Sequence, residues 1–277
     1  MNLRITAVVA AGLLIVAAIL LAPRKPAPSE QQTEAPAPSA SESDFETQIV
    51  EVKKSLDAGS LASLEFFEEQ ISRQGSTNQN QWFDSLSNFW DRQMRPGIAA
   101  EYVYRKAEST NSGNDWYNAG SRYLGISRFF EEQDRMALID KAIFCLDKAH
   151  EIAPADNAIK TRLASAYVES GKDPMKGIFL LREVIEQEPE NIDALMNLGF
   201  FSMQSGQFDK AIDRFKNVLK IDPSLTEVRI YLSEALEASG NSSEALNELE
   251  KIKKSDADSF LLAEAQKRID AIKNSTN

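Results

Sequence analysis

The fold is decided by residues 191–223, which read NIDALMNLGFFSMQSGQFDKAIDRFKNVLKIDP. Leu195 and Leu198 lie on one face of a predicted first helix, and Gly206 ends it. A second helix carries a buried stripe at i, i+4 and i+7, formed by Ala211, Phe215 and Val218. Pro223 ends this helix because proline lacks an N–H and its ring clashes with the preceding turn. The segment therefore predicts a helical hairpin.

The landmarks of this hairpin recur along the chain at one period. The prolines, 35 and then 34 residues apart, are Pro154, Pro189 and Pro223. The glycines that end the first helices are Gly171, Gly206 and Gly240. The small residues near the start of the second helices are Ala142, Gly177, Ala211 and Ala245. A repeat of this length indicates one unit stacked on copies of itself, because a single hairpin cannot bury its own apolar face.

The repeating unit resembles the tetratricopeptide repeat, whose pattern is Trp-x2-Leu-Gly-x2-Tyr, then Ala-x3-Phe, then Pro. Here the pattern reads Leu195-x2-Leu198-Gly199, then Ala211-x3-Phe215, then Pro223. An earlier unit opens with Trp116-x2-Ala119-Gly120-x2-Tyr123. The resemblance covers about 113–257 and implies an all-α solenoid of helical hairpins. Gly199 and Ala211 are expected where the two helices of one hairpin cross.

Two segments depart from the regular period. About ten extra residues, around Phe129–Leu138, separate the halves of the first unit. We interpret them as extra turns on both of its helices and not as a new domain. Ser259–Lys273 has helical spacing and a charged outer face, as expected of a helix that caps an open solenoid end.

Four further stretches of helical spacing precede the repeats. They begin at Phe45, Leu61, Phe83 and Ile98. We predict two hairpins here, either degenerate repeats or a helical cap. Trp82 and Trp90 are expected to serve in packing and not as a stacking platform.

The N-terminal segment Ile5–Ala22 carries no charge and consists almost wholly of Ala, Val, Ile and Leu. Its 18 residues, at about 1.5 Å each, nearly cross a hydrocarbon core of about 30 Å. A cleaved secretory signal is the alternative, but its apolar run is usually shorter. Pro23 and Arg24 also suit a signal peptidase poorly. We therefore expect an uncleaved single-pass anchor.

The predicted organisation has five parts. They are a membrane anchor (1–25), a Pro/Ala/Ser-rich tether (26–43), helical hairpins (44–110), repeats (111–257), and a capping helix with a tail (258–277). Arg4 before the span nearly balances Arg24 and Lys25 after it, so the positive-inside rule gives almost a tie. The four-residue N-terminal tail and the tether favour an extracytoplasmic domain over one on the cytoplasmic face.

Composition excludes several function classes. With 31 Lys and Arg against 42 Asp and Glu, the net charge is −11, which argues against nucleic-acid binding. The sequence lacks phosphate-binding loops and hydrolase elbows. His150 is the only histidine and Cys145 the only cysteine, and we interpret both as structural. We expect no catalytic residues, no metal site and no cofactor.

The resemblance implies that first helices line a concave groove. The residues predicted to bind a partner there are Tyr117, Met196, Asn197, Phe200, Met203, Glu227, Ile230, Tyr231 and Glu234. An apolar centre flanked by acids suits an amphipathic helix or a peptide with basic flanks. A clamp for a C-terminal carboxylate is not expected, because Met196 stands where family members have Lys. Alternatively, Phe200 and Met203 only seal the interface between neighbouring units.

The layout of anchor, tether and short repeat domain resembles membrane-anchored repeat proteins of the bacterial envelope. The resemblance implies a scaffold or assembly factor that captures a peptide segment or helix of a partner protein. The alternative is a structural subunit docked permanently in a membrane complex, for example in cytochrome c maturation or secretion machinery.

Overall fold

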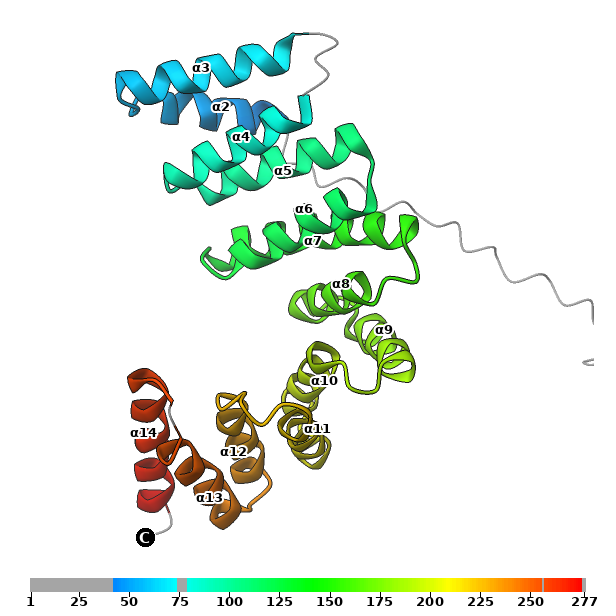
Figure 1. Cartoon of the computed structure of the whole chain (residues 1–277), viewed down its shortest axis with the longest axis vertical. Helices are drawn as coiled ribbons and strands as arrows, with labels where there is room; N and C mark the ends of the chain where they lie inside the picture. The colour runs from blue at the N-terminus through cyan, green and yellow to red at the C-terminus, as the bar shows by residue number, and fades with distance from the viewer. Residues whose placement is uncertain (1–41, 74–78, 256, 276–277) are drawn as a thin grey trace, which may run out of the picture. The chain divides into compact units, whose positions relative to one another are not determined.

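The computed structural model describes residues 42–73, 79–255 and 257–275, all within the compact unit Ala37–Asn277. These residues form 13 α-helices and no strand (Figure 1). The helices before the repeats are α2 (Glu42–Lys53), α3 (Ala58–Ser72), α4 (Gln79–Arg92) and α5 (Pro96–Thr110). The helices of the repeats are α6 (Gly113–Ser127), α7 (Glu132–Ile152), α8 (Asn157–Ser170), α9 (Pro174–Gln187), α10 (Ile192–Gln204), α11 (Phe208–Ile221), α12 (Val228–Ala238) and α13 (Ser242–Lys253). The last helix is α14 (Ser259–Ser275).

Side-chain caps and glycines set the ends of the repeat helices. Asp156 and Asn191 precede α8 and α10, and each accepts a hydrogen bond from a backbone N–H of the first turn. Gly171, Gly206 and Gly240 follow the first helices α8, α10 and α12 with φ of 65°, 71° and 85°. Only glycine adopts this left-handed region at little cost, which explains the recurrence of glycine at these positions.

The small residues within the helices allow the two helices of a hairpin to approach closely. A Cβ atom at Gly120 would lie 2.5 Å from Leu146 Cγ, and one at Gly199 would lie 2.5 Å from Phe215 Cε1. Both distances are far below van der Waals contact. The predicted close crossing at Gly199 is therefore confirmed, and Gly120 shows the same relationship in the first repeat.

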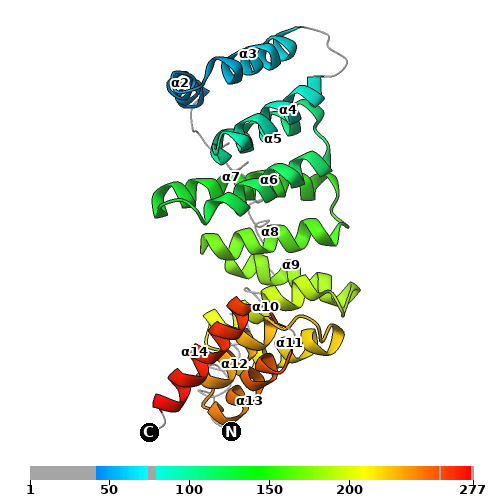
Figure 2. The same cartoon turned by 60° about the vertical axis from the view of Figure 1, so that its left-hand side comes forward.

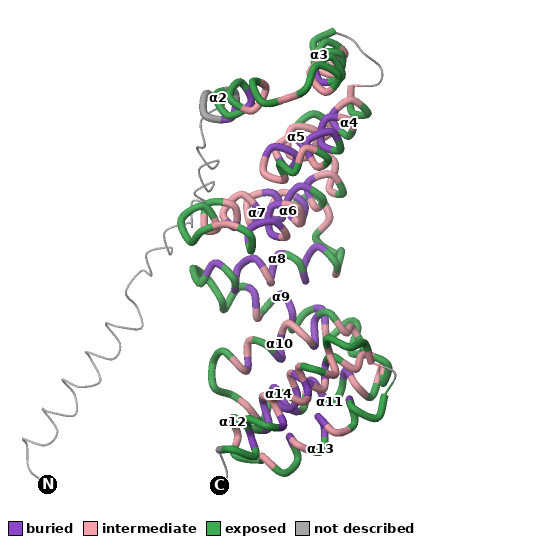
Figure 3. The backbone as a smooth tube through the Cα atoms, turned by 90° about the vertical axis from the view of Figure 1, so that its left-hand side faces the viewer, coloured by how far each residue is buried: buried purple, intermediate pink, exposed green. Residues whose placement is uncertain are grey.

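Three hydrophobic clusters fill the spaces between successive helices. One lies within α2–α5, one joins α5–α10, and one joins α10–α14. Figure 2 shows the repeat hairpins following one another in chain order. Buried residues concentrate where neighbouring helices face each other, whereas α3 is mostly exposed and has only Leu64 buried (Figure 3).

Aromatic side chains pack within and between the helices that precede the repeats. Trp90 is fully buried and meets Phe89 edge to face, with ring centroids 5.1 Å apart. Trp82 is half-buried and contacts Phe66, whose centroid lies 5.6 Å away. The predicted packing role of both tryptophans is confirmed.

The insert in the first repeat lengthens one helix and not two. The first helix α6 has 15 residues, close to the 14 of α8. The second helix α7 has 21 residues, against 14 in α9 and in α11. The predicted extra turns on both helices were therefore wrong for α6. The extra residues form the connecting turn and the first turns of α7.

The C-terminal helix α14 packs on α13 and completes the last cluster through Ala265, Ile269 and Ile272 (Figures 1 and 2). This arrangement confirms the predicted helix at Ser259–Lys273 and its capping position.

The predicted anchor Ile5–Ala22 and most of the predicted tether lie outside the described residues. Of the helices in residues 42–73, 79–255 and 257–275, none combines the length and the apolar character that crossing a bilayer requires.

Candidate functional site

The exposed aromatic ring of Phe200 is the centre of the predicted binding stripe on α10. Phe200 is 39% exposed, whereas Met196 and Met203 are half-buried against the C-terminal cluster. The Phe200 ring meets Tyr231 of the next first helix edge to face, with centroids 4.8 Å apart. It also contacts Phe215, at 5.6 Å. Phe200 therefore joins two neighbouring repeats and still offers part of its ring to solvent.

The structure places the two predicted apolar residues of α12 differently. Tyr231 is half-buried beside Phe200. Ile230 is only 6% exposed and belongs to the core cluster that α14 completes. The prediction that Ile230 faces a groove was therefore wrong, because on α12, the first helix of the last repeat, Ile230 points into the core.

Asn197 is occupied by contacts within the protein. Its Oδ1 accepts a hydrogen bond from the Ser165 hydroxyl at 2.9 Å, and its Nδ2 donates to the Asp193 carbonyl oxygen at 2.8 Å. Because both the oxygen and the nitrogen of its amide are hydrogen-bonded within the protein, Asn197 is not free to bind a carboxylate of a partner. The side chain instead ties α10 to α8.

The predicted acidic flank consists of one exposed and one paired carboxylate. Glu227 is exposed directly before α12. Glu234 forms an ion pair with Arg268 of α14 at 2.5 Å, and Arg268 also pairs with Glu264 at 2.8 Å. Asp193 and Glu237 are also exposed on α10 and α12. The local charge remains negative through these carboxylates and Glu227.

Tyr117 is not part of this set. It lies on α6, half-buried, and packs against the cluster of α5–α10 and not against the cluster that contains Met196, Met203 and Tyr231. The structure thus brings Met196, Phe200, Met203, Glu227 and Tyr231 to neighbouring first helices. We call these five residues the α10–α12 face.

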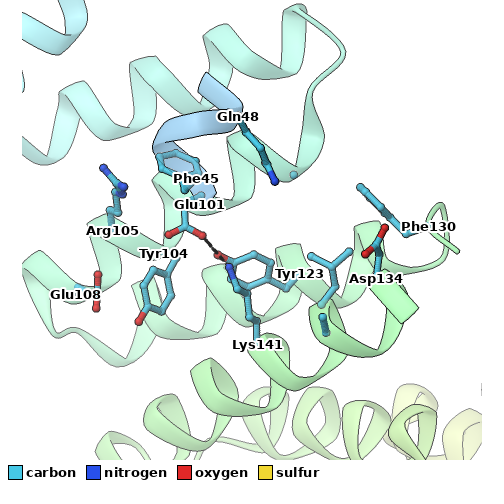
Figure 4. Close-up of a pocket in the computed structure, with 13 residues that line it drawn as sticks. Phe45, Gln48, Glu101, Tyr104, Arg105, Glu108, Tyr123, Phe130, Asp134 and Lys141 are labelled. Atoms are coloured by element: carbon cyan, nitrogen blue, oxygen red, sulfur yellow. Dashed lines mark hydrogen bonds and ion pairs between the residues drawn. The ribbon is translucent and has the colours of Figure 1, made fainter. Parts of the chain in front are cut away.

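Sequence reasoning missed a pocket of about 480 Å³ between α2, α5, α6 and α7 (Figure 4). Its lining residues are Phe45, Gln48, Gly97, Glu101, Tyr104, Arg105, Glu108, Tyr123, Phe130, Asp134, Ala137, Leu138 and Lys141. Most of them come from the second helices α5 and α7, not from the first helices on which the predicted groove lies.

A polar group forms the centre of this pocket. The Glu101 carboxylate accepts hydrogen bonds from the Tyr123 hydroxyl at 2.8 Å and from Lys141 Nζ at 3.1 Å. Burial, reinforced by the negative charge of Glu101, raises the pKa of Tyr123 well above its usual value. Tyr123 therefore remains a protonated donor at neutral pH.

The pocket was not predicted because it depends on contacts that are distant in sequence. Phe45 of α2 packs on Tyr102 of α5, with centroids 5.7 Å apart, and Arg105 lies over the Phe45 ring at 4.3 Å. The helical spacing of Phe45 predicted a helix but not its partner. The only available signal was the aromatic and charged character of α5 itself.

No cluster of three or more metal-ligating side chains occurs among the residues that the structure describes. Cys145 is fully buried, and burial raises the pKa of its thiol, as expected of an unreactive core residue. His150 is half-buried in the last turn of α7.

Two family models match the chain. Residues 135–227 match the model described as the cytochrome c-type biogenesis protein H TPR domain, and residues 202–269 match the tetratricopeptide repeat. A curated relative from Bos taurus, the BBSome complex member BBS4, is 28% identical over 136 residues. That match covers 46% of this chain but only 22% of the relative, so the chain spans about a fifth of the relative's length.

Solved structures of MamA share the fold. MamA from Desulfovibrio magneticus RS-1 is 16% identical, with a TM-score of 0.52 over 64% of this chain and 97% of that one. A second MamA crystal structure is 18% identical, with a TM-score of 0.50 over 64% of this chain and 91% of the other. The two family models together match residues 135–269 to tetratricopeptide repeats, and the solved structures share the repeat fold.

Proposed function

We propose that this protein is a scaffold that holds a partner segment against the α10–α12 face. The supporting observation is the exposed ring of Phe200. The residue at the same place in the other first helices, directly after the small residue of the helix crossing, is polar: Ser121, Ser165 and Glu234. A large aromatic side chain at this place is not needed by the repeat itself. Exposed apolar side chains that gather on one face usually mark an interaction site.

The proposed partner segment is an amphipathic helix or a peptide with basic flanks. Half-buried Met196 and Met203 flank Phe200, and methionine adapts readily to different ligand shapes. Asp193, Glu227 and Glu237 place uncompensated negative charge around them. Because these carboxylates are exposed, the binding should weaken as the salt concentration rises.

Photo-crosslinking in native membranes tests this function. A photoreactive amino acid at Met203 should capture one protein, and Phe200→Ala in the same chain should abolish the capture. The matched control is Phe179→Ala, because Phe179 is 58% exposed on the second helix α9, outside the proposed face. Capture that survives Phe200→Ala, or that is lost equally in both variants, contradicts a binding role of the α10–α12 face.

We further propose that Ile5–Ala22 anchors the protein in a membrane and that the repeats lie outside the cytoplasm. The proposal is supported by the uncharged run and the short tail before it. Protease added to spheroplasts should digest the repeats. Protection until the membrane is lysed would instead place them inside, and a mature N-terminus beyond Ala22 would remove the anchor.

A permanently docked subunit of a membrane complex is the second candidate. It is favoured by the match of residues 135–227 to a domain described for cytochrome c-type biogenesis, and by a relative described as a complex member. Exchanging residues 1–25 for an unrelated anchor separates the two functions. A scaffold that captures its partner through the α10–α12 face should keep its function, whereas a subunit docked through its own anchor should lose it.

A further inference from the structure

The pocket between α2, α5, α6 and α7 contains two cations, and both are already engaged inside the protein. Lys141 binds Glu101 at 3.1 Å and lies over the Tyr123 ring at 5.3 Å. The Arg105 guanidinium lies over the Phe45 ring at 4.3 Å. Lys141 and Arg105 are therefore both engaged by a carboxylate or aromatic rings of the pocket itself.

The carboxylates at the two ends of the pocket are not matched in this way. Figure 4 shows Asp134 near Phe130 at one end, and Glu108 near Tyr104 and Arg105 at the other. Both carboxylates are exposed, and neither forms an ion pair within the described part of the chain. The pocket therefore offers negative charge to a ligand at both ends.

Apolar surface lies between these charges. The Phe130 ring approaches Gly97, within 3.8 Å of where a Cβ would be. Ala137 and Leu138 of α7 add aliphatic surface to the lining. Carboxylates beside aromatic and aliphatic surface suit the long stems and cationic ends of lysine and arginine.

The length of the pocket distinguishes a peptide from a small cation. Its lining runs along α5 from Gly97 to Glu108, which at about 1.5 Å per residue is about 16 Å. An extended peptide covers this distance in about five residues at about 3.3 Å each. A compact organic cation with one positive charge would pair with only one of the two terminal carboxylates.

We propose that this pocket binds a short extended peptide segment of a partner protein, in which lysine or arginine alternates with apolar residues. Its cations pair with Asp134 and Glu108, and its apolar side chains lie against Phe130 and Leu138. This site is distinct from the α10–α12 face, because it is built on the second helices α5 and α7 together with α2.

The test uses a dye-labelled hexapeptide of alternating lysine and leucine, acetylated and amidated, with binding to the whole chain followed by fluorescence anisotropy. Asp134→Lys should weaken binding by about tenfold or more, because it replaces attraction by repulsion at one end. The matched control is Glu186→Lys, which changes the net charge equally at an exposed position of α9 outside the pocket.

A second variant tests the shape of the site without changing its charge. Ala137 is exposed on α7 and lines the pocket, so Ala137→Trp should fill the pocket without disturbing the core. Binding should again fall by about tenfold, with an unchanged thermal melt as the control for folding.

Four results would overturn the proposal. They are no binding of the hexapeptide, equal binding of its glutamate-for-lysine counterpart, unchanged binding in either pocket variant, and full displacement by spermidine at equal concentration. The last would indicate a site for small cations. Phe200→Ala should leave hexapeptide binding unchanged, and Asp134→Lys should leave crosslinking at Met203 unchanged. Failure of one proposal is therefore distinguishable from failure of the other.

Discussion

The Phe215 ring of α11 lies directly against the backbone of Gly199 on α10. A Cβ atom at position 199 would come within 2.5 Å of Phe215 Cε1 and 2.9 Å of its Cζ. Phe215 is itself fully buried. The ring occupies the space that the missing side chain of glycine leaves, so the closest contact of this hairpin depends on both residues.

Gly199→Leu should therefore destabilise the protein. The added side chain overpacks a filled contact, and such changes typically cost about 1–3 kcal/mol in the free energy of unfolding. Urea denaturation of wild type and variant measures the loss.

The control is a glycine-to-leucine substitution at a position where the added side chain would meet no neighbouring atoms. A Cβ at Gly125 of α6 meets no atom within 4 Å. Gly125→Leu should be neutral or slightly stabilising, since glycine in a helix costs about 0.5–1 kcal/mol relative to alanine. Asp209→Leu, at an exposed position early in α11, should also be mild. Losses as large as that of Gly199→Leu would contradict the close crossing.

Phe200 and Phe215 should respond differently to truncation. Phe215→Ala should cost about 3–5 kcal/mol, because it removes a fully buried ring. Phe200→Ala should cost only about 1 kcal/mol, because the ring is partly exposed and loses mainly its edge-to-face contacts with Phe215 and Tyr231. Equal losses in thermal or urea melts would mean that Phe200 serves only to seal the repeat interface.

Features that depend on local backbone geometry were predictable from the sequence. Gly206 ends α10 in the left-handed region, where glycine is favoured whatever its tertiary surroundings. Gly199 was recognisable because helix spacing places it opposite the second helix of its own hairpin. Both relationships are contained within a few tens of residues.

Features that depend on distant packing were not predictable. Ile230 and Tyr231 are adjacent on α12, but Ile230 is buried in the cluster of α10–α14, whereas Tyr231 is half-buried beside Phe200. The pocket depends on Phe45 reaching α5 across more than 50 residues of sequence. Periodicity identifies the apolar side of a helix, but it does not identify which other helix covers that side.

The ion pair of Arg229 and Glu248 provides a third prediction. Glu248 is 5% exposed and accepts from Arg229 at 2.7 Å and from Lys251 at 2.5 Å. Arg229→Leu should destabilise by about 3 kcal/mol, because it leaves a buried carboxylate with one partner at its rim. The double variant Arg229→Leu with Glu248→Leu should recover most of the loss in urea melts, since no buried charge then remains. A double variant less stable than either single variant would show that the pair is itself a net source of stability.

The last prediction concerns His150, whose Nδ1 is buried without a hydrogen-bond partner among the described residues. Burial lowers its pKa below the ordinary 6.5, and the positive charges of Lys160 and Lys176 act in the same direction, whereas Asp147 and Glu183 oppose them. The unfolded chain therefore binds a proton at a pH where the folded chain does not. This contribution to stability is fully present above about pH 6.5 and is lost as the pH falls towards the lowered folded pKa.

Glu169 does not produce the same loss. The side chain is exposed, but partial desolvation raises the pKa of its carboxyl against the lowering effect of Arg128, Arg135 and Arg162. The folded state therefore gains relative stability as the pH falls, which is the opposite sign. His150→Gln should therefore flatten the decline in unfolding free energy between about pH 7 and about pH 5.5, measured by urea denaturation at each pH. An unchanged slope in the variant would show that other groups cause the decline and that the buried imidazole is not the group that titrates.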